Sequence, residues 1–220
     1  MSKKAFISNV IMMGSIWGIL EATVGYTLHH IPNFISGSLM FPIGALIIFV
    51  EYNAERKRLA ILLTGAIAAM LKTVNFFMPI RSSSSVLNPM MAIMVETLVL
   101  MVVMPYFLKL DNKVTFRSVL LTMFGCLTSG VLNKSIFFVY SSLKSGTECI
   151  VEQFGSIEKI IETIVNVVQN GLLSGAIFFA GICLIRFISS KIDLKSKCLV
   201  NPLSASVSAV LAVVLTLYHN

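Results

Sequence analysis

Residues 14–30 of the chain read GSIWGILEATVGYTLHH and lie mostly within an apolar run from residue 5 to residue 28. This length suits a helix that crosses a lipid bilayer, because about 20 consecutive apolar residues span the hydrocarbon core. The stretch nevertheless holds a carboxylate, Glu21, near its middle and ends on His29 and His30. Its apolar length predicts the fold class, and Glu21 raises the question of function.

Apolar runs of similar length follow along the chain. Of its 220 residues, 56% are hydrophobic and 12% are charged, against about 25% charged residues in soluble domains. Runs of about 18 or more apolar residues are typical of membrane-spanning helices. Six lie at 5–28, 35–53, 59–79, 87–109, 117–142 and 163–187, and a seventh, weaker run covers 203–218. We expect an all-α polytopic membrane protein, a single integral membrane domain over 1–220, with six transmembrane helices as three hairpins and a possible seventh helix.

The basic residues predict the orientation. If six helices alternate, twelve of the 17 lysines and arginines, Lys3 and Lys4 among them, fall on one side. By the positive-inside rule, that side and the N-terminus face the cytoplasm. We expect the protein to lie in the cell membrane. We expect the first run to be a retained helix, because it is too long for a signal peptide. The net charge of +7 then reflects topology, and no basic stripe with aromatic residues indicates a nucleic-acid partner.

The first predicted helix has a face of small residues that also carries Glu21. Its members are Gly14, Gly18, Glu21, Ala22, Gly25 and His29. Small residues let helices approach closely in lipid, so Glu21 is expected to face protein. Lys72 stands 51 positions after Glu21, among small residues with matching spacing. The first two hairpins therefore resemble repeats, which in transporters enclose the binding site.

Ionisable and amide residues, Asn133 among them, gather at one predicted depth, in the outer half of the membrane. Charged groups within a membrane are candidates for function by default. We therefore predict a pocket for a hydrophilic or zwitterionic solute, lined by Glu21, Lys72, Asn75, Asn88, Glu96 and Lys134. The alternative is that Glu21–Lys72 and Glu96–Lys134 are structural ion pairs that hold helices together.

Motifs for other chemistry are missing from the sequence. His29 and His30 have no third ligand nearby, and the four cysteines show no CxxC spacing, so we predict no metal site. Gly125 and Gly130 have the spacing of a phosphate-binding loop, but Val131 stands where that loop needs lysine. We therefore expect no cofactor and no enzymatic activity. Uphill transport would draw its energy from an ion gradient or a partner.

In length, helix number and one motif, the chain resembles the substrate-binding S component of energy-coupling factor (ECF) transporters. The motif is Gly14-x3-Gly18-x3-Ala22 in the first helix, and the resemblance in architecture covers residues 5–190. It implies uptake of a vitamin, cofactor precursor or metal ion. It also implies a transmembrane coupling subunit, docked on Gly14, Gly18 and Ala22, and cytosolic ATPases. Glu21 departs from this pattern by sharing the glycine face, so either Glu21 pairs internally or the glycines pack against the chain's own helices.

Two other classes of function stay open on the sequence. An ion-driven secondary carrier would use Glu21 or Glu96 as its proton or sodium site. An integral-membrane enzyme or assembly factor would use Glu96 or His29 as an acid–base group, although no convergent catalytic set is evident.

Overall fold

The computed structural model describes residues 3–25, 28, 37–73, 83–109, 116–145, 155–191 and 207–214, and these contain helices and no strand. The elements are α1 (Lys3–Leu20), the π-helix η1 (Glu21–Gly25), α3 (Gly37–Glu55), α4 (Arg58–Lys72), α5 (Ser83–Lys109), α6 (Phe116–Ser145) and α8 (Ile157–Lys191). A short helix follows over 207–214. The prediction of an all-α membrane protein is thereby confirmed at the level of fold class.

Five helices are long and apolar enough to cross a membrane within the described part of the chain. They cover Lys3–Gly25, Ser38–Glu55, Val86–Tyr106, Arg117–Tyr140 and Ile157–Phe187. The remaining predicted span, 59–79, is described only as far as residue 73 and contains the 15 residues of α4. The described part of the seventh run is about 12 Å long at 1.5 Å per residue, less than half of the roughly 30 Å hydrocarbon core.

Helix α8 begins earlier than the sequence predicts, at Ile157 rather than at residue 163. Its first turns hold Glu158, Lys159 and Glu162, which interrupt an apolar run without interrupting a helix. Hydropathy therefore underestimates this helix, because it measures the preference for lipid and not the preference for helical backbone.

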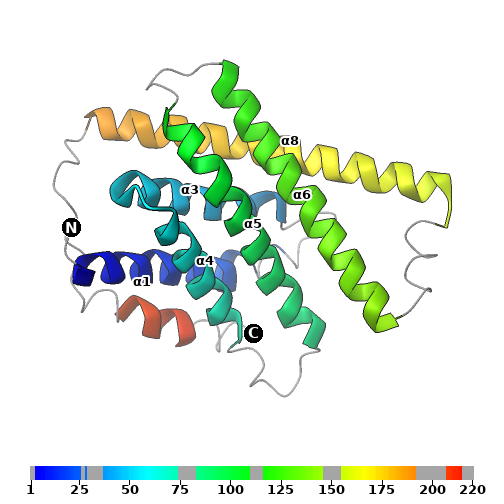
Figure 1. Cartoon of the computed structure of the whole chain (residues 1–220), viewed down its shortest axis with the longest axis horizontal. Coiled ribbons are helices and arrows are strands. Elements are labelled where there is room, and N and C mark those ends of the chain that lie inside the picture. The colour runs from blue at the N-terminus through cyan, green and yellow to red at the C-terminus, as the bar shows by residue number, and fades with distance from the viewer. Residues whose placement is uncertain are drawn as a thin grey trace.

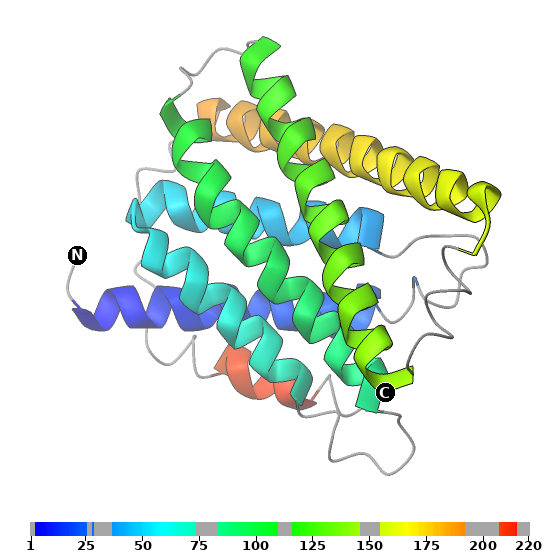
Figure 2. The ribbon, with the colours of Figure 1, turned by 45° about the vertical axis from the view of Figure 1, so that its right-hand side comes forward.

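The six long helices form two layers of three. In both views α1, α3 and α8 lie side by side, and α4, α5 and α6 cross them as a second layer (Figures 1 and 2). The layers are closed at one edge by α1 against α4 and at the other by α6 against α8. The three consecutive pairs α1/α3, α4/α5 and α6/α8 are all in contact, as the predicted hairpins require.

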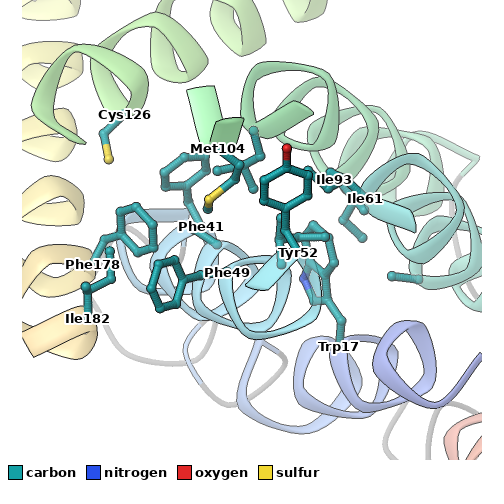
Figure 3. Close-up of a cluster of buried hydrophobic side chains, with 14 of the residues drawn as sticks. Trp17, Phe41, Phe49, Tyr52, Ile61, Ile93, Met104, Cys126, Phe178 and Ile182 are labelled. Atoms are coloured by element: carbon teal, nitrogen blue, oxygen red, sulfur yellow. The ribbon is translucent and has the colours of Figure 1, made fainter. Parts of the chain in front are cut away.

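The hydrophobic core is centred on α3. This helix buries Phe41, Ile48, Phe49 and Tyr52 between the two layers. Trp17 approaches from α1, Met104 from α5, and Phe178 and Ile182 from α8 (Figure 3). The aromatic cluster fills the middle of the bundle and leaves space toward the end where α3, α5 and α8 begin.

Candidate functional site

A cavity of about 280 Å³ lies between α3, α5, α6 and α8. It occupies the end of the bundle at which α3, α5 and α8 begin and α6 ends. This volume is close to the lower limit of about 300 Å³ for small-molecule sites. The lining comprises Ser38, Phe41, Asn88, Met91, Ala92, Glu96, Cys126, Ser129, Gly130, Asn133, Lys134, Ile136, Phe137, Val167, Asn170, Gly171 and Ser174.

The cavity is deep relative to its width, because it follows two antiparallel helices. Asn88 and Glu96 are eight residues apart on α5, and Lys134 and Cys126 are eight apart on α6, about 12 Å in each case. Among the lining residues, Glu96 lies furthest along α5 from its start and Cys126 lies nearest the start of the antiparallel α6. Glu96 and Cys126 therefore form the floor, and Asn88 and the exposed Lys134 lie at the mouth.

Two polar atoms in the cavity wall are buried without a hydrogen-bond partner among the described residues. They are the side-chain oxygens of Asn88 and Ser129. Other hydroxyls on α6 are satisfied inside their own helix: Thr122 donates to the Ser118 carbonyl at 2.7 Å, and Thr128 to the Phe124 carbonyl at 2.8 Å. A buried polar group without a partner costs about 1–3 kcal/mol, so Asn88 and Ser129 gain from a ligand or water in the cavity.

Hydrogen bonds between α3 and α8 hold the other wall in place. Ser38 Oγ donates to Asn170 Oδ1 at 2.6 Å, and Ser174 Oγ donates to the Ser38 carbonyl at 3.0 Å. Asn170 in turn donates through Nδ2 to the Asn166 carbonyl at 2.6 Å. Since the amide of Asn170 is held at both ends, its orientation at the cavity wall is determined before any ligand binds.

Close approach of α6 and α8 shapes the same region. Gly171 and Gly175 stand one turn apart on α8, and a Cβ at Gly171 would lie 3.2 Å from the Cα of Leu127. A Cβ at Gly175 would lie 3.3 Å from Met123 Cγ. This small-xxx-small pair lets the two helices pack closely beside the cavity, as is common between membrane helices.

The structure brings four polar residues of the predicted depth level together and separates two. Asn88, Glu96, Asn133 and Lys134 all line the cavity, whereas Glu21 and Lys72 do not. Asn75, His29 and His30 lie outside the described residues. No ion pair joins Glu96 and Lys134, both of which are described.

Glu21 and Lys72 form a buried contact of their own between η1 and the end of α4. Lys72 Nζ lies 3.9 Å from Glu21 Oε1 and donates to the backbone carbonyl of Glu21 at 3.2 Å. The backbone changes from α- to π-helix at Glu21, where the ordinary ladder of backbone hydrogen bonds is interrupted. This pair lies outside the cavity lining.

The small-residue face of α1 is covered by α4 of the same chain. A Cβ at Gly14 would lie 2.8 Å from Ile67 Cβ, and one at Gly18 would collide with Leu71. Ala22 has no exposed surface. The residues predicted to dock a coupling subunit, Gly14, Gly18 and Ala22, are therefore occupied by internal packing, which is the alternative that the position of Glu21 raised.

Comparison with known proteins adds nothing to this geometry. The chain matches no protein-family model, no curated protein and no solved structure. The interpretation of the cavity therefore depends on its own chemistry.

The sequence prediction did not name several polar residues that line the cavity. Ser38, Ser129, Asn170 and Ser174 line the cavity, and Asn170 was detectable as an amide within an apolar run. The serines had no such signal, because serine is ordinary in membrane helices.

A second buried carboxylate was also missed, near the other end of α3. Glu51 has no exposed surface, accepts a hydrogen bond from Thr64 Oγ1 and has no partner for Oε1 among the described residues. One turn further along, Glu55 Oε1 accepts from Asn9 Nδ2 at 3.2 Å.

The described residues contain no group of three or more His, Cys, Asp and Glu side chains that could hold a metal ion. The polar groups of the cavity are amides, hydroxyls, one carboxylate, one ammonium and one thiol. Such a set can bind a polar organic molecule through charge and hydrogen bonds.

Proposed function

We propose that this protein is a membrane-embedded subunit that binds a small hydrophilic solute, such as a vitamin, cofactor precursor or metal ion, for uptake. The observation that carries the proposal is the pair of unpartnered atoms, Asn88 Oδ1 and Ser129 Oγ, in the wall of a cavity within the bundle. A purely structural bundle gains nothing from such atoms, whereas a solute with hydrogen-bonding groups satisfies both.

The energy for uptake comes, in this proposal, from partners. The sequence carries no complete nucleotide-binding loop, and its architecture resembles the ECF S component, which relies on a transmembrane coupling subunit and cytosolic ATPases. Because α4 covers the glycine face of α1, a coupling subunit would have to contact a different surface. The distribution of basic residues supports a cell-membrane location with the N-terminus in the cytoplasm.

Native mass spectrometry of the protein, extracted gently from its own membranes, tests both the binding of a solute and the presence of energising partners. A bound small molecule, a second membrane protein and ATPase subunits are the expected masses. A chain that carries neither solute nor partner contradicts the proposal.

Neighbouring hydroxyls on α6 provide a matched pair of variants for this measurement. Ser129→Ala removes the unpartnered cavity hydroxyl, and we expect it to lower the fraction of protein that retains solute about tenfold, the effect of one hydrogen bond to a buried group. Thr128→Ala removes a hydroxyl that is bonded within its own helix, and solute retention should be unchanged. Equal retention in the two variants would remove Ser129 from the site.

An ion-driven carrier is the second candidate. It is favoured by two buried carboxylates in spanning helices, Glu96 at the cavity floor and Glu51 near the other end of α3. Uptake into vesicles containing the purified protein alone, driven by an imposed proton or sodium gradient, would establish this class. Uptake that requires ATP and the co-purified subunits excludes it.

A further inference from the structure

Among the described residues that line the cavity, one carries a formal negative charge and one a formal positive charge, and they lie at its two ends. Glu96 is buried at the floor on α5, and Lys134 is exposed at the mouth on α6. The helix rise puts the two levels about 12 Å apart. No ion pair between them is found, although both belong to the described residues.

The wall between these two charges is mainly apolar. Phe41, Met91 and Val167 contribute apolar side chains, Ser129 adds an unpartnered oxygen, and Asn88, with the second unpartnered oxygen, and Phe137 lie toward the mouth. A molecule that fills the cavity therefore meets a carboxylate at its inner end, apolar surface in its middle and an ammonium group at its outer end.

From this arrangement we infer that the solute is an elongated zwitterion. Its cationic group, an ammonium or protonated nitrogen heterocycle, binds Glu96, its alkyl or aromatic middle packs against Phe41 and Met91, and its carboxylate or phosphate binds Lys134. This inference rests on the proposed function and adds the chemical class of the solute and its orientation in the cavity.

Charge placement excludes the simpler classes of solute. A plain anion would leave Glu96 without a counter-charge at the floor, because Lys134 lies at the mouth. An ordinary α-amino acid has its two charges on neighbouring atoms and cannot reach both ends of a cavity two helical turns deep. A plain cation would satisfy Glu96 and leave Lys134 unused.

Cys126 provides a reporter at the floor, where Glu96 also lines the cavity. In a full-length variant with Cys149, Cys183 and Cys198 replaced by alanine, it is the sole remaining thiol of the four. The purified protein is treated with trimethylammonioethyl or sulfonatoethyl methanethiosulfonate, which forms a mixed disulfide with Cys126 and releases methanesulfinate. Each rate is divided by the rate of the same reagent with free β-mercaptoethanol.

We expect the cationic reagent to modify Cys126 about tenfold faster than the anionic one, because opposite charges attract strongly at a buried site. Glu96→Gln should bring the normalised ratio to about one. Glu51→Gln is the matched control, since it neutralises a buried carboxylate outside the cavity lining and should leave the ratio unchanged. Equal rates in the unaltered protein, a ratio that survives Glu96→Gln, or no modification of Cys126 overturns the inference.

Protection of Cys126 from modification by added ligands tests the role of Lys134 at the outer end of the cavity. ε-Aminocaproate carries both charges on one chain, whereas caproate and hexylamine each carry one. We expect ε-aminocaproate to slow modification at about tenfold lower concentration than hexylamine, and Lys134→Gln to abolish this advantage. Equal protection by hexylamine, or no protection by ε-aminocaproate, contradicts the role of Lys134.

These outcomes are separate from those of the proposed function. Charge-selective access to Cys126 together with a native complex that lacks ATPases would retain the zwitterion site and overturn the energising partners. A native complex with ATPases and a solute of another charge class would do the reverse.

Discussion

Single buried charges contribute to the stability of this protein, and Lys72 is the clearest example. Its ammonium group is buried and meets both the carboxylate and the backbone carbonyl of Glu21. We expect Lys72→Met to destabilise the protein by about 3–5 kcal/mol, because it leaves the buried Glu21 without its counter-charge. Thermal unfolding of the purified variant, followed by circular dichroism, measures this loss.

The double variant Glu21→Gln/Lys72→Met separates charge from packing. It should recover most but not all of the lost stability, since the Glu21 carbonyl still lacks the donor that Lys72 supplied. Full loss in Lys72→Met with no recovery in the double variant would show that the hydrogen bond to the carbonyl, and not the ion pair, dominates.

At the scale of elements, the contact between α1 and α4 determines how the two layers join. A Cβ at Gly14 would lie 2.8 Å from Ile67 Cβ and 2.9 Å from the Thr64 carbonyl oxygen. We therefore expect Gly14→Ala to destabilise the protein by about 1–3 kcal/mol through overpacking, despite the better helix propensity of alanine. Chemical unfolding in mixed detergent micelles is the measurement.

Gly125 on α6 offers the matched control for this prediction. A Cβ there would lie 3.5 Å from Val103 Cγ1, which is an ordinary contact. Gly125→Ala should be neutral or slightly stabilising. If both alanine variants behaved alike, close packing at Gly14 would not explain the glycine in α1.

At the scale of the whole molecule, the number of membrane-spanning helices between two loops determines whether the loops face the same side of the membrane. Three helices, α4, α5 and α6, separate the turn at Lys57 from the turn at Gly155, so these two exposed residues belong on opposite sides of a membrane. With the N-terminus inside, Lys57→Cys should react with a membrane-impermeant maleimide only after cells are permeabilised. Gly155→Cys should react in intact cells.

Both variants are made in a background without the native cysteines. The reverse pattern would invert the predicted orientation while retaining the bundle. Labelling of both positions from one side would contradict the bundle as a set of membrane spans.

The amino-acid sequence was sufficient for the fold class, and several residues that it singled out line the cavity. Apolar runs located the long helices because the hydrocarbon core demands a minimum length of apolar side chains. Counting depth along those runs placed Asn88, Glu96, Asn133 and Lys134 at the end of the bundle where the cavity lies. Depth is a property of each helix alone, so it can be read without knowing the neighbours.

Only the tertiary structure decided which residues of equal depth share a space. Glu21 and Lys72 lie at the predicted level but belong to the α1/α4 edge, while the cavity is enclosed by α3, α5, α6 and α8. Ser129 has no partner among the described residues, whereas Thr128 donates to the Phe124 carbonyl of its own helix. Helical periodicity gives the direction of each side chain about the axis of its helix. The rotation and pairing of the helices arise instead from packing. Trp17, Gly14 and Gly171 contribute to this packing through contacts with residues far away in the sequence.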